Sequence, residues 1–234
     1  MSEPWVVIPT YNESNNAPRL VAELFALNIP RLHVLIVDDN SPDGTGQAVR
    51  KLQPTYPHLY LLTRPNKSGL GRAYIHGFCL ALERGASTVV QMDADFSHDP
   101  KDVPRLLGAL SEADVVIGSR YIGGISVVNW PLFRLLLSTA ANQYARLVTG
   151  LPYQDVTGGF RAWTSFALQQ LDLTSIKADG YGFQIVTAFR AAKKKLRIKE
   201  IPIIFTERRA GDSKMNRAIM WEAFWLVLKL RLFG

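Results

Sequence analysis

Two aspartates, Asp93 and Asp95, stand one residue apart directly after an apolar run at 88–92. A buried carboxylate is costly unless a cation or hydrogen-bond donors compensate its charge. The run therefore either ends at the surface or presents both acids to a cation. Carboxylate oxygens suit Mg²⁺ or Mn²⁺, and one or two carboxylates plus substrate phosphates is the usual magnesium arrangement. The alternative interpretation is a pair of solvated turn acids.

The elements that would position these acids are short apolar runs alternating with helical periods. The candidate strands lie at residues 5–8, 34–37, 59–62, 88–92, 115–117 and, interrupted by Pro202, 198–205. Helical spacing of apolar residues occurs at 20–25, 71–83, 104–110 and 131–149. This alternation predicts an α/β fold with a mostly parallel, Rossmann-like sheet flanked by helices. The proline favours an edge position for the last strand.

Polar residues collect where four of these strands end. They are the segments 9–13 (PTYNE), 38–39 (DD), 93–95 (DAD) and 118–121 (GSRY). In open parallel sheets, ligands bind beyond the carboxyl ends of the strands. A purely structural protein has no reason to gather polar side chains on one edge four times, so the sequence predicts a binding site there.

Glycine-rich phosphate loops are missing from the sequence. No G-x-G-x-x-G follows the first strand, and the pair Gly69 and Gly71 lacks the third glycine because position 74 is tyrosine. No G-x-x-x-x-G-K-[ST] occurs. A phosphorylated ligand would therefore be neutralised by a divalent ion and basic side chains.

The composition fits a single globular domain. The chain has 234 residues, 47% hydrophobic and 20% charged, with a formal net charge of +7. The change of character near residue 122 divides it into two halves, 1–121 and 122–234. Positive charge gathers late, from Lys193 to Arg217, and a solvated helix face is an alternative interpretation of Lys193–Lys195. No nucleic-acid-binding pattern accompanies it, so nucleic acid is not an expected partner.

The sequence favours a cytoplasmic location. Cys79 is the single cysteine, which excludes an internal disulfide. Met1–Pro4 lack a basic n-region, and no apolar stretch reaches the ~20 residues of a membrane span.

Taken together, the polar segments resemble the family 2 glycosyltransferases of GT-A fold. More narrowly, the chain resembles the dolichol-phosphate or polyprenol-phosphate mannose synthases, from residue 5 to about 217. The narrower resemblance is carried by the segments 69–77, 129–131 (NWP), 155–161 (DVTGGFR) and 180–184 (GYGFQ).

The resemblance implies transfer of mannose from GDP-mannose to a polyprenyl (dolichyl-type) monophosphate with inversion, using Mg²⁺ or Mn²⁺. Two alternatives stay open. One is a transferase of the same fold that moves glucose or an amino sugar to a lipid phosphate. The other is a non-catalytic nucleotide-sugar-binding subunit, against which the retained acids and basic residues argue.

The resemblance also implies that 1–121 is the nucleotide-sugar half and 122–234 the acceptor half, and it implies roles for individual residues. The guanine–ribose end of the donor is expected at Pro9, Tyr11, Glu13, Val37 and Asp39, and the ribose and diphosphate at Asp93, Ala94 and Asp95. The metal is expected on Asp95, with Asp93 supporting it and Ser97 standing where relatives often carry glutamine. Arg120 is expected near the donor, Arg208 and Lys214 over the diphosphate, and Arg134 and Ser138 at the lipid phosphate. Asp95, Arg120 and Arg134 are the residues expected to act on the reacting groups.

A phosphate acceptor explains why the sequence offers no obvious general base. A lipid phosphate is already ionised at pH 7, and none of the four histidines forms a convincing nucleophile–base pair. The acceptor lies in a membrane, so we expect peripheral association with its cytosolic face or a membrane-anchoring subunit. The candidate interfacial helices are 131–149 and the tail 215–233, where Trp221, Phe224, Trp225 and Leu228 share one side. Ordinary core packing of the tail is the alternative.

Overall fold

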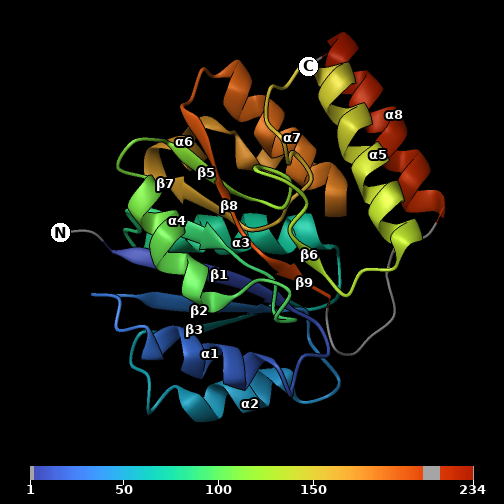
Figure 1. Cartoon of the computed structure of the whole chain (residues 1–234). Coiled ribbons are helices and arrows are strands. Elements are labelled where there is room, and N and C mark those ends of the chain that lie inside the picture. The colour runs from blue at the N-terminus through green and yellow to red at the C-terminus, as the bar shows by residue number, and fades with distance from the viewer. Residues whose placement is uncertain (1–2, 208–216, 234) are drawn as a thin grey trace.

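A seven-stranded sheet forms the centre of the molecule (Figure 1), in a computed structural model that describes residues 3–207 and 217–233. Its strands run in the order β3-β2-β1-β4-β7-β5-β8. Their bounds are β1 Pro4–Thr10, β2 His33–Asp38, β3 Leu59–Thr63, β4 Thr88–Gln91, β5 Val115–Ser119, β7 Arg161–Thr164 and β8 Ile198–Pro202. A separate pair joins β6, Val127–Val128, to β9, Phe205–Thr206. The mostly parallel α/β sheet predicted from the sequence is confirmed.

Strand β7 is an element of the central sheet that the sequence did not predict. It lies antiparallel between β4 and β5. Ala162 pairs with Val90 on one side and with Val116 on the other. The second half of the chain therefore supplies strands to the same sheet as the first. Strand β8 forms the edge, as the proline indicated.

Helices cover both faces of the sheet (Figure 1). They are α1 Ala17–Ala26, α2 Thr45–Leu52, α3 Leu70–Glu83, α4 Val103–Ala109, α5 Leu132–Thr149, α6 Ser165–Gln170, α7 Gly180–Lys193 and α8 Arg217–Phe233, with short 3₁₀ turns at Pro100–Asp102 and Leu173–Ser175. Alternate strand residues divide the core. Val6, Ile8 and Val34 pack with α1 and α4, whereas Val7 and Val37 pack with α3 on the opposite face.

Two helix ends show how local side chains set the bounds of the helices. Gly85 follows the last residues of α3 with φ of +83°, as a glycine beyond a helix end should. Thr45 is the first residue of α2 rather than its cap, and its hydroxyl donates to Asp43 at 2.6 Å. Asp43 also accepts the Thr45 N–H, so this aspartate satisfies the first backbone donor of α2.

Helices α5 and α8 lie side by side at the right of Figure 1, outside α7. They meet α7 through a third apolar cluster that includes Ala145, Phe189 and Val227. Asn142 links α5 to the loop that precedes β7. Its amide nitrogen donates to the Gln154 carbonyl, and its amide oxygen accepts from the Val156 N–H at 3.0 Å. Within the described residues, no helix is long and apolar enough to cross a membrane.

Gly77 sets how closely α3 approaches the sheet. A Cβ at this position would stand 2.4 Å from Val7 Cγ1 and 3.0 Å from Val37 Cγ2. Both neighbours are β-branched and stiff at χ1, so they cannot rotate away without strain. We predict that Gly77→Ala lowers the free energy of unfolding by about 1–3 kcal/mol, the usual range for overpacking.

The matched control for this prediction is Gly108→Ala in α4, where a Cβ would meet nothing within 4 Å. That substitution should leave stability unchanged or raise it by up to about 1 kcal/mol, the helix-propensity difference between the residues. Urea unfolding of both variants measures the contrast, and equal effects would contradict the packing argument.

Candidate functional site

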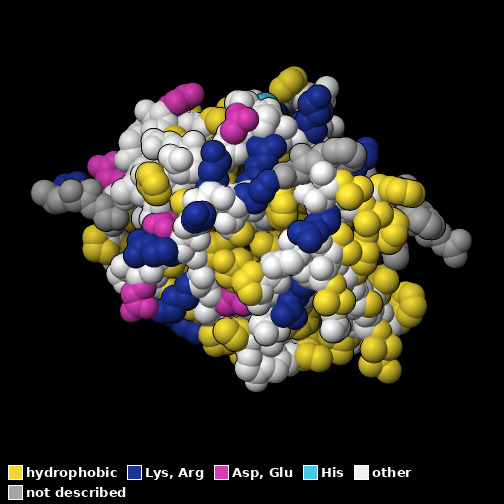
Figure 2. All heavy atoms as spheres, turned by 90° about the horizontal axis from the view of Figure 1, so that it is seen from above, with side chains coloured by type: hydrophobic (Ala, Val, Ile, Leu, Met, Phe, Trp, Pro, Cys, Tyr) yellow, Lys and Arg dark blue, Asp and Glu magenta, His cyan; other side chains and the backbone are white. Residues whose placement is uncertain are grey.

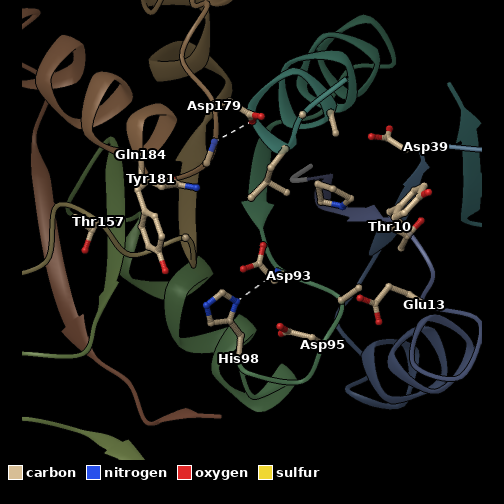
Figure 3. A pocket seen from close by; sticks show the side chains of 18 of the residues that line it. Thr10, Glu13, Asp39, Asp93, Asp95, His98, Thr157, Asp179, Tyr181 and Gln184 are labelled. Carbon is tan, nitrogen blue, oxygen red and sulfur yellow. Dashed lines mark hydrogen bonds between the residues drawn. The ribbon is translucent and has the colours of Figure 1, made fainter. Parts of the chain in front are cut away.

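A cavity of about 520 Å³ opens at the carboxyl ends of β1, β2 and β4. Figure 3 shows acids and polar side chains entering it from both halves of the chain. Thr10, Glu13 and Asp39 stand on one side, Thr157, Tyr181 and Gln184 on the other, and Asp93 and Asp95 between them. The binding edge inferred from strand ends is therefore a real cavity in the folded chain.

Four of the five residues expected at the nucleoside end line this cavity, namely Pro9, Tyr11, Glu13 and Asp39. Val37 does not: its side chain is buried in the core beneath α3 and approaches the position of Gly77. Val37 lies inside β2, whereas Asp39 stands just beyond the end of that strand at Asp38, where the chain reaches the edge of the sheet. Asp38 accepts hydrogen bonds from the hydroxyls of Thr10 at 3.0 Å and Ser41 at 2.6 Å.

Tyr11 and Asp39 each have a basic neighbour that sequence reasoning missed. The Lys67 ammonium lies 4.1 Å from the centroid of the Tyr11 ring, and Arg64 Nε lies 3.3 Å from Asp39 Oδ1. Burial raises the pKa of Asp39, while the charge of Arg64 opposes that shift. Lys67 lines the cavity, so this end offers an aromatic face, a carboxylate and an ammonium together.

The turn after β4 carries Asp93, Ala94 and Asp95 into the cavity. Asp93 Oδ1 accepts a hydrogen bond of 2.7 Å from the Tyr74 hydroxyl, and Asp95 Oδ1 accepts one of 3.1 Å from the Ser97 N–H. The Ser97 hydroxyl is buried, and no described residue gives it a hydrogen-bond partner. Hydrogen bonds therefore hold the carboxylates of Asp93 and Asp95, whereas the Ser97 hydroxyl is held by none from the described residues, and Ser97 does not line the cavity.

This turn fits a divalent cation that shares its coordination with a phosphorylated ligand. No group of three or more His, Cys, Asp or Glu side chains among the described residues forms a complete cage. Two carboxylates and a buried hydroxyl oxygen of the required hard type are present, and phosphate oxygens would supply the remaining ligands. The chemistry of the donor set thus agrees with Mg²⁺ or Mn²⁺.

His98 belongs to the site although the sequence did not single it out. Its imidazole is buried, stacks on Phe160 with ring centroids 4.7 Å apart, and lines the cavity. The Asp93 N–H donates to its Nδ1 at 3.3 Å, drawn as a dashed line in Figure 3. Burial lowers the pKa of His98, although the nearby acids oppose this, and a neutral ring with an unprotonated Nδ1 is what the hydrogen bond requires. The sequence signal that could have found His98 is its place only five residues after Asp93, close to the predicted metal ligands.

Arg120 lines the cavity, but its guanidinium is already paired. It donates to both carboxylate oxygens of Asp155 at 2.7 Å and to the Thr157 hydroxyl at 2.8 Å. Burial alone would raise the pKa of Asp155, but the charge and hydrogen bonds of Arg120 outweigh it and lower that pKa. The action of Arg120 on the donor stays a prediction, while its contacts show that it holds the loop before β7.

A second buried arginine, Arg161, stands behind the same loop. Its guanidinium donates to the carbonyls of Val156, Gly158 and Gln184. Burial lowers its pKa to about 10, although Asp155 opposes this shift. Arg120, Asp155 and Arg161 therefore fix the backbone of the segment 155–161 beside the cavity.

On the expected acceptor side, Arg134 lines the cavity and Ser138 does not. Arg134 pairs with Glu207 and lies over the Trp130 ring, 4.7 Å from its centroid. Its side chain is only 19% exposed, so most of it is shielded from solvent. Ser138 lies one turn further along α5, where its hydroxyl is 3.0 Å from the Tyr121 hydroxyl.

Two further predicted residues, Arg208 and Lys214, lie outside the described residues. Three basic side chains of the described chain line the cavity, and two of them, Arg120 and Arg134, are ion-paired with acids. The third, Lys67, rests on the Tyr11 ring. A diphosphate in the cavity would therefore need positive charge from a bound metal ion or from other parts of the chain.

The start of α7 closes the far side of the cavity, in a segment for which the sequence suggested a resemblance but no residue roles. Asp179 Oδ1 accepts from the Gly71 N–H at 2.6 Å and from the Gly180 N–H at 2.8 Å, so one carboxylate joins the first turns of α3 and α7. Gly69 has φ of +102°, and a Cβ there would stand 2.1 Å from Asp179. The Gly69–Gly71 pair thus permits this junction. Gln184 and Tyr181 line the cavity beside it.

The fold and this acidic edge place the chain in the GT-A class of glycosyltransferase folds. The family model described as "Glycosyl transferase family 2" matches residues 5–171. The chain belongs to glycosyl transferase family 2, and the family resemblance seen in the sequence is confirmed.

Two relatives match nearly the whole chain. An undecaprenyl-phosphate mannosyltransferase of Micrococcus luteus is 46% identical over 217 residues, covering 93% of this chain and 89% of that protein. A polyprenol monophosphomannose synthase of Mycolicibacterium smegmatis is 43% identical over 231 residues, covering 98% and 87%.

A solved structure shows the same fold at low identity. Glucosyl-3-phosphoglycerate synthase from Mycobacterium tuberculosis, in complex with Mn²⁺, UDP-glucose and phosphoglyceric acid, has a TM-score of 0.71 and 18% identity. The match covers 100% of this chain and 81% of that one. At this identity the likeness concerns the fold alone.

The Arg120–Asp155 pair gives a stability prediction. Breaking a buried ion pair typically costs about 3–5 kcal/mol, so Asp155→Asn should lower the free energy of unfolding by that amount at pH 7. Because the pKa of Asp155 is lowered by folding, its contribution is present above its unfolded pKa of about 3.9 and is lost as the pH falls through the folded pKa. The difference between wild type and variant should therefore shrink below about pH 4.

The control is Glu112→Gln, which weakens an ion pair with Lys199 in which the two side chains are 69% and 43% exposed. Exposed pairs contribute about 0–1 kcal/mol. Urea unfolding at pH 7 and at pH 3.5 measures both variants. A cost for Asp155→Asn no larger than that of the control would contradict the importance of the buried pair.

Proposed function

We propose that the protein transfers mannose from GDP-mannose to a polyprenyl (dolichyl-type) monophosphate with inversion, giving a β-linked polyprenyl-phosphate mannose. The observation that carries the proposal is the pair of relatives, 43% and 46% identical over nearly the whole chain, whose names specify mannose and a polyprenyl phosphate. The cavity supports it, because one continuous space joins a nucleoside end, a pair of carboxylates and Arg134 at the start of α5.

The nucleoside end suits a guanine base and a ribose. Tyr11 and Pro9 provide apolar surface, and the carboxylates of Glu13 and Asp39 accept hydrogen bonds from base or ribose donors. Lys67 adds a donor at the same end. Asp93 and Asp95 would hold Mg²⁺ or Mn²⁺, which when bound would neutralise the diphosphate as the anomeric bond breaks.

Catalysis in this proposal rests on positioning rather than on proton removal. The acceptor phosphate is ionised at pH 7, so it needs no general base. His98 agrees with this, because it is buried and its Nδ1 already accepts the Asp93 N–H. Arg134 stands where the acceptor phosphate would enter, and exchange of its Glu207 partner for that phosphate would leave its charge paired throughout.

The polyprenyl chain requires an apolar surface beside the cavity, and α5 and α8 supply one. Figure 2 shows hydrophobic side chains gathered on the side where Figure 1 places these helices. The exposed residues are Leu132, Phe133, Leu136 and Leu147 on α5, and Phe224, Trp225 and Leu232 on α8. Leu132, Phe133 and Leu136 surround Arg134 in the sequence, so the apolar surface begins at the cavity.

Helix α8 has side chains that suit each of the two interpretations of the tail, core packing and contact with a membrane interface. Val227 is buried, and Leu226 and Leu230 pack against the core, whereas Trp225 is 57% exposed. Trp221 lies in the part of α8 whose side chains the structure does not describe. We propose that α5 and α8 together rest on the cytosolic face of a membrane, as interfacial helices do, with or without an anchoring subunit.

Transfer itself is the first test. Purified protein with GDP-mannose, a polyprenyl phosphate and Mn²⁺ or Mg²⁺ should yield mannosylated lipid phosphate, identified by mass spectrometry with its anomeric configuration from NMR. Asp95→Ala should reduce the rate about 100- to 1,000-fold, the usual cost of losing one preorganised electrostatic contact. Glu112→Ala, an exposed acid paired with Lys199, is the control and should keep its activity.

Each alternative has its own outcome in this assay. Preference for a glucose or amino-sugar donor would replace mannose in the proposal, and nucleotide-sugar binding without transfer would favour the non-catalytic subunit. Full activity in EDTA would contradict the proposed requirement for a divalent metal ion.

Membrane contact is tested with liposomes. We predict co-sedimentation with anionic vesicles that weakens in high salt, because basic residues near an anionic surface add about 1 kcal/mol each. The double variant Phe133→Ser, Leu136→Ser should sediment less than wild type. Phe166→Ser removes a comparably exposed aromatic ring from α6, away from α5 and α8, and should sediment normally. Equal loss in both variants would contradict a membrane face at α5.

A further inference from the structure

Tyr74 occupies an unusual position for a tyrosine within the core of this fold. It lies on α3, is fully buried, and does not line the cavity. Its ring packs between Phe78 and Phe183, with centroids 5.7 Å and 6.0 Å away. A phenylalanine would fill the same apolar space, so packing alone does not call for the hydroxyl group.

The hydroxyl has one specific contact, a hydrogen bond of 2.7 Å to Asp93 Oδ1. It reaches the carboxylate from the core side, behind the cavity wall. The other oxygen, Oδ2, lies toward Gly159, where a Cβ would stand 3.6 Å from it. The Asp93 N–H is held at the same time by His98, so both the backbone and the carboxylate of this residue have fixed directions.

The chemical nature of the donor matters. Two other buried acids of the site region, Asp39 and Asp155, are joined to Arg64 and Arg120, which bring a full positive charge to each carboxylate. Tyr74 orients Asp93 without adding positive charge. An anionic ligand of a divalent cation needs this combination, because a cationic partner would weaken the attraction of the carboxylate for the metal.

We infer that Tyr74 is a positioning residue for the metal site: its hydroxyl holds Asp93 Oδ1 on the α3 side and so directs the carboxylate into the cavity. The inference rests on the metal-dependent part of the proposed function. It does not depend on which sugar is transferred or on which lipid accepts it.

The decisive variant is Tyr74→Phe, which keeps the ring and removes only the hydroxyl. The test measures two quantities. One is the Mn²⁺ affinity in the presence of saturating GDP, from electron paramagnetic resonance of the free ion, and the other is the melting temperature without metal. Loss of an outer-shell partner typically weakens metal affinity about 10- to 100-fold, and we expect about 10-fold. Tyr56→Phe is the control, because it removes a hydroxyl from a ring stacked on Phe25, remote from the cavity, and should leave Mn²⁺ affinity unchanged.

A double-mutant cycle separates positioning from general loosening of the core. If Tyr74 acts through Asp93, then Tyr74→Phe should have no further effect on Mn²⁺ affinity in an Asp93→Ala background. The inference is overturned by unchanged affinity in Tyr74→Phe, or by the full loss recurring in the Asp93→Ala background, which would indicate a structural role. Failure of wild type to bind Mn²⁺ with GDP would overturn it together with the metal site. Failure of mannose transfer with intact Mn²⁺ binding would affect the proposed function alone.

Discussion

The buried ion pair between Arg120 and Asp155 joins the two halves of the chain at the edge of the cavity. Each carboxylate oxygen of Asp155 receives one guanidinium hydrogen bond. A charge removed from water this completely is tolerated only when it is paired, so the loop that carries Asp155 has little freedom to adopt another path. Because Arg161 holds the same loop from its other side, β7 enters the sheet between β4 and β5. Gly159 within the loop then faces Asp93 Oδ2, and the second half of the chain closes the site.

The acids around the cavity are distinguished by their partners rather than by their exposure. Asp155 is paired with arginine and supports the fold, and Asp179 joins two helix starts through backbone N–H groups. Asp93 and Asp95 face the cavity, where the Tyr74 hydroxyl donates to Asp93 and the Ser97 N–H donates to Asp95. The apolar face of α5 and α8 begins at Arg134, where the cavity ends. In the proposed reaction, the diphosphate of the donor and the lipid of the acceptor would match this gradient from charge to hydrocarbon.

The sequence by itself determined the parallel part of the sheet and the acidic edge. A strand buried on both faces must be an apolar run, and a carboxylate after such a run marks its end, so Asp39, Asp93 and Asp95 could be assigned to one edge from residue types alone. The helices expected at 71–83 and 131–149 followed from equally local signals. These features depend on residues within one turn or one strand of each other.

Only the tertiary structure decided which partners the site residues have. Strand β7 was hidden because its four residues begin with a buried arginine, whose charge is compensated by carbonyls of the preceding loop and by that of Gln184, twenty-three positions further along the chain. The same reason applies to Tyr74, nineteen positions before Asp93, and to Asp155, thirty-five positions after Arg120. Whether a buried polar group is structural or functional depends on what the fold brings against it, and that contact is absent from any local pattern of residue types.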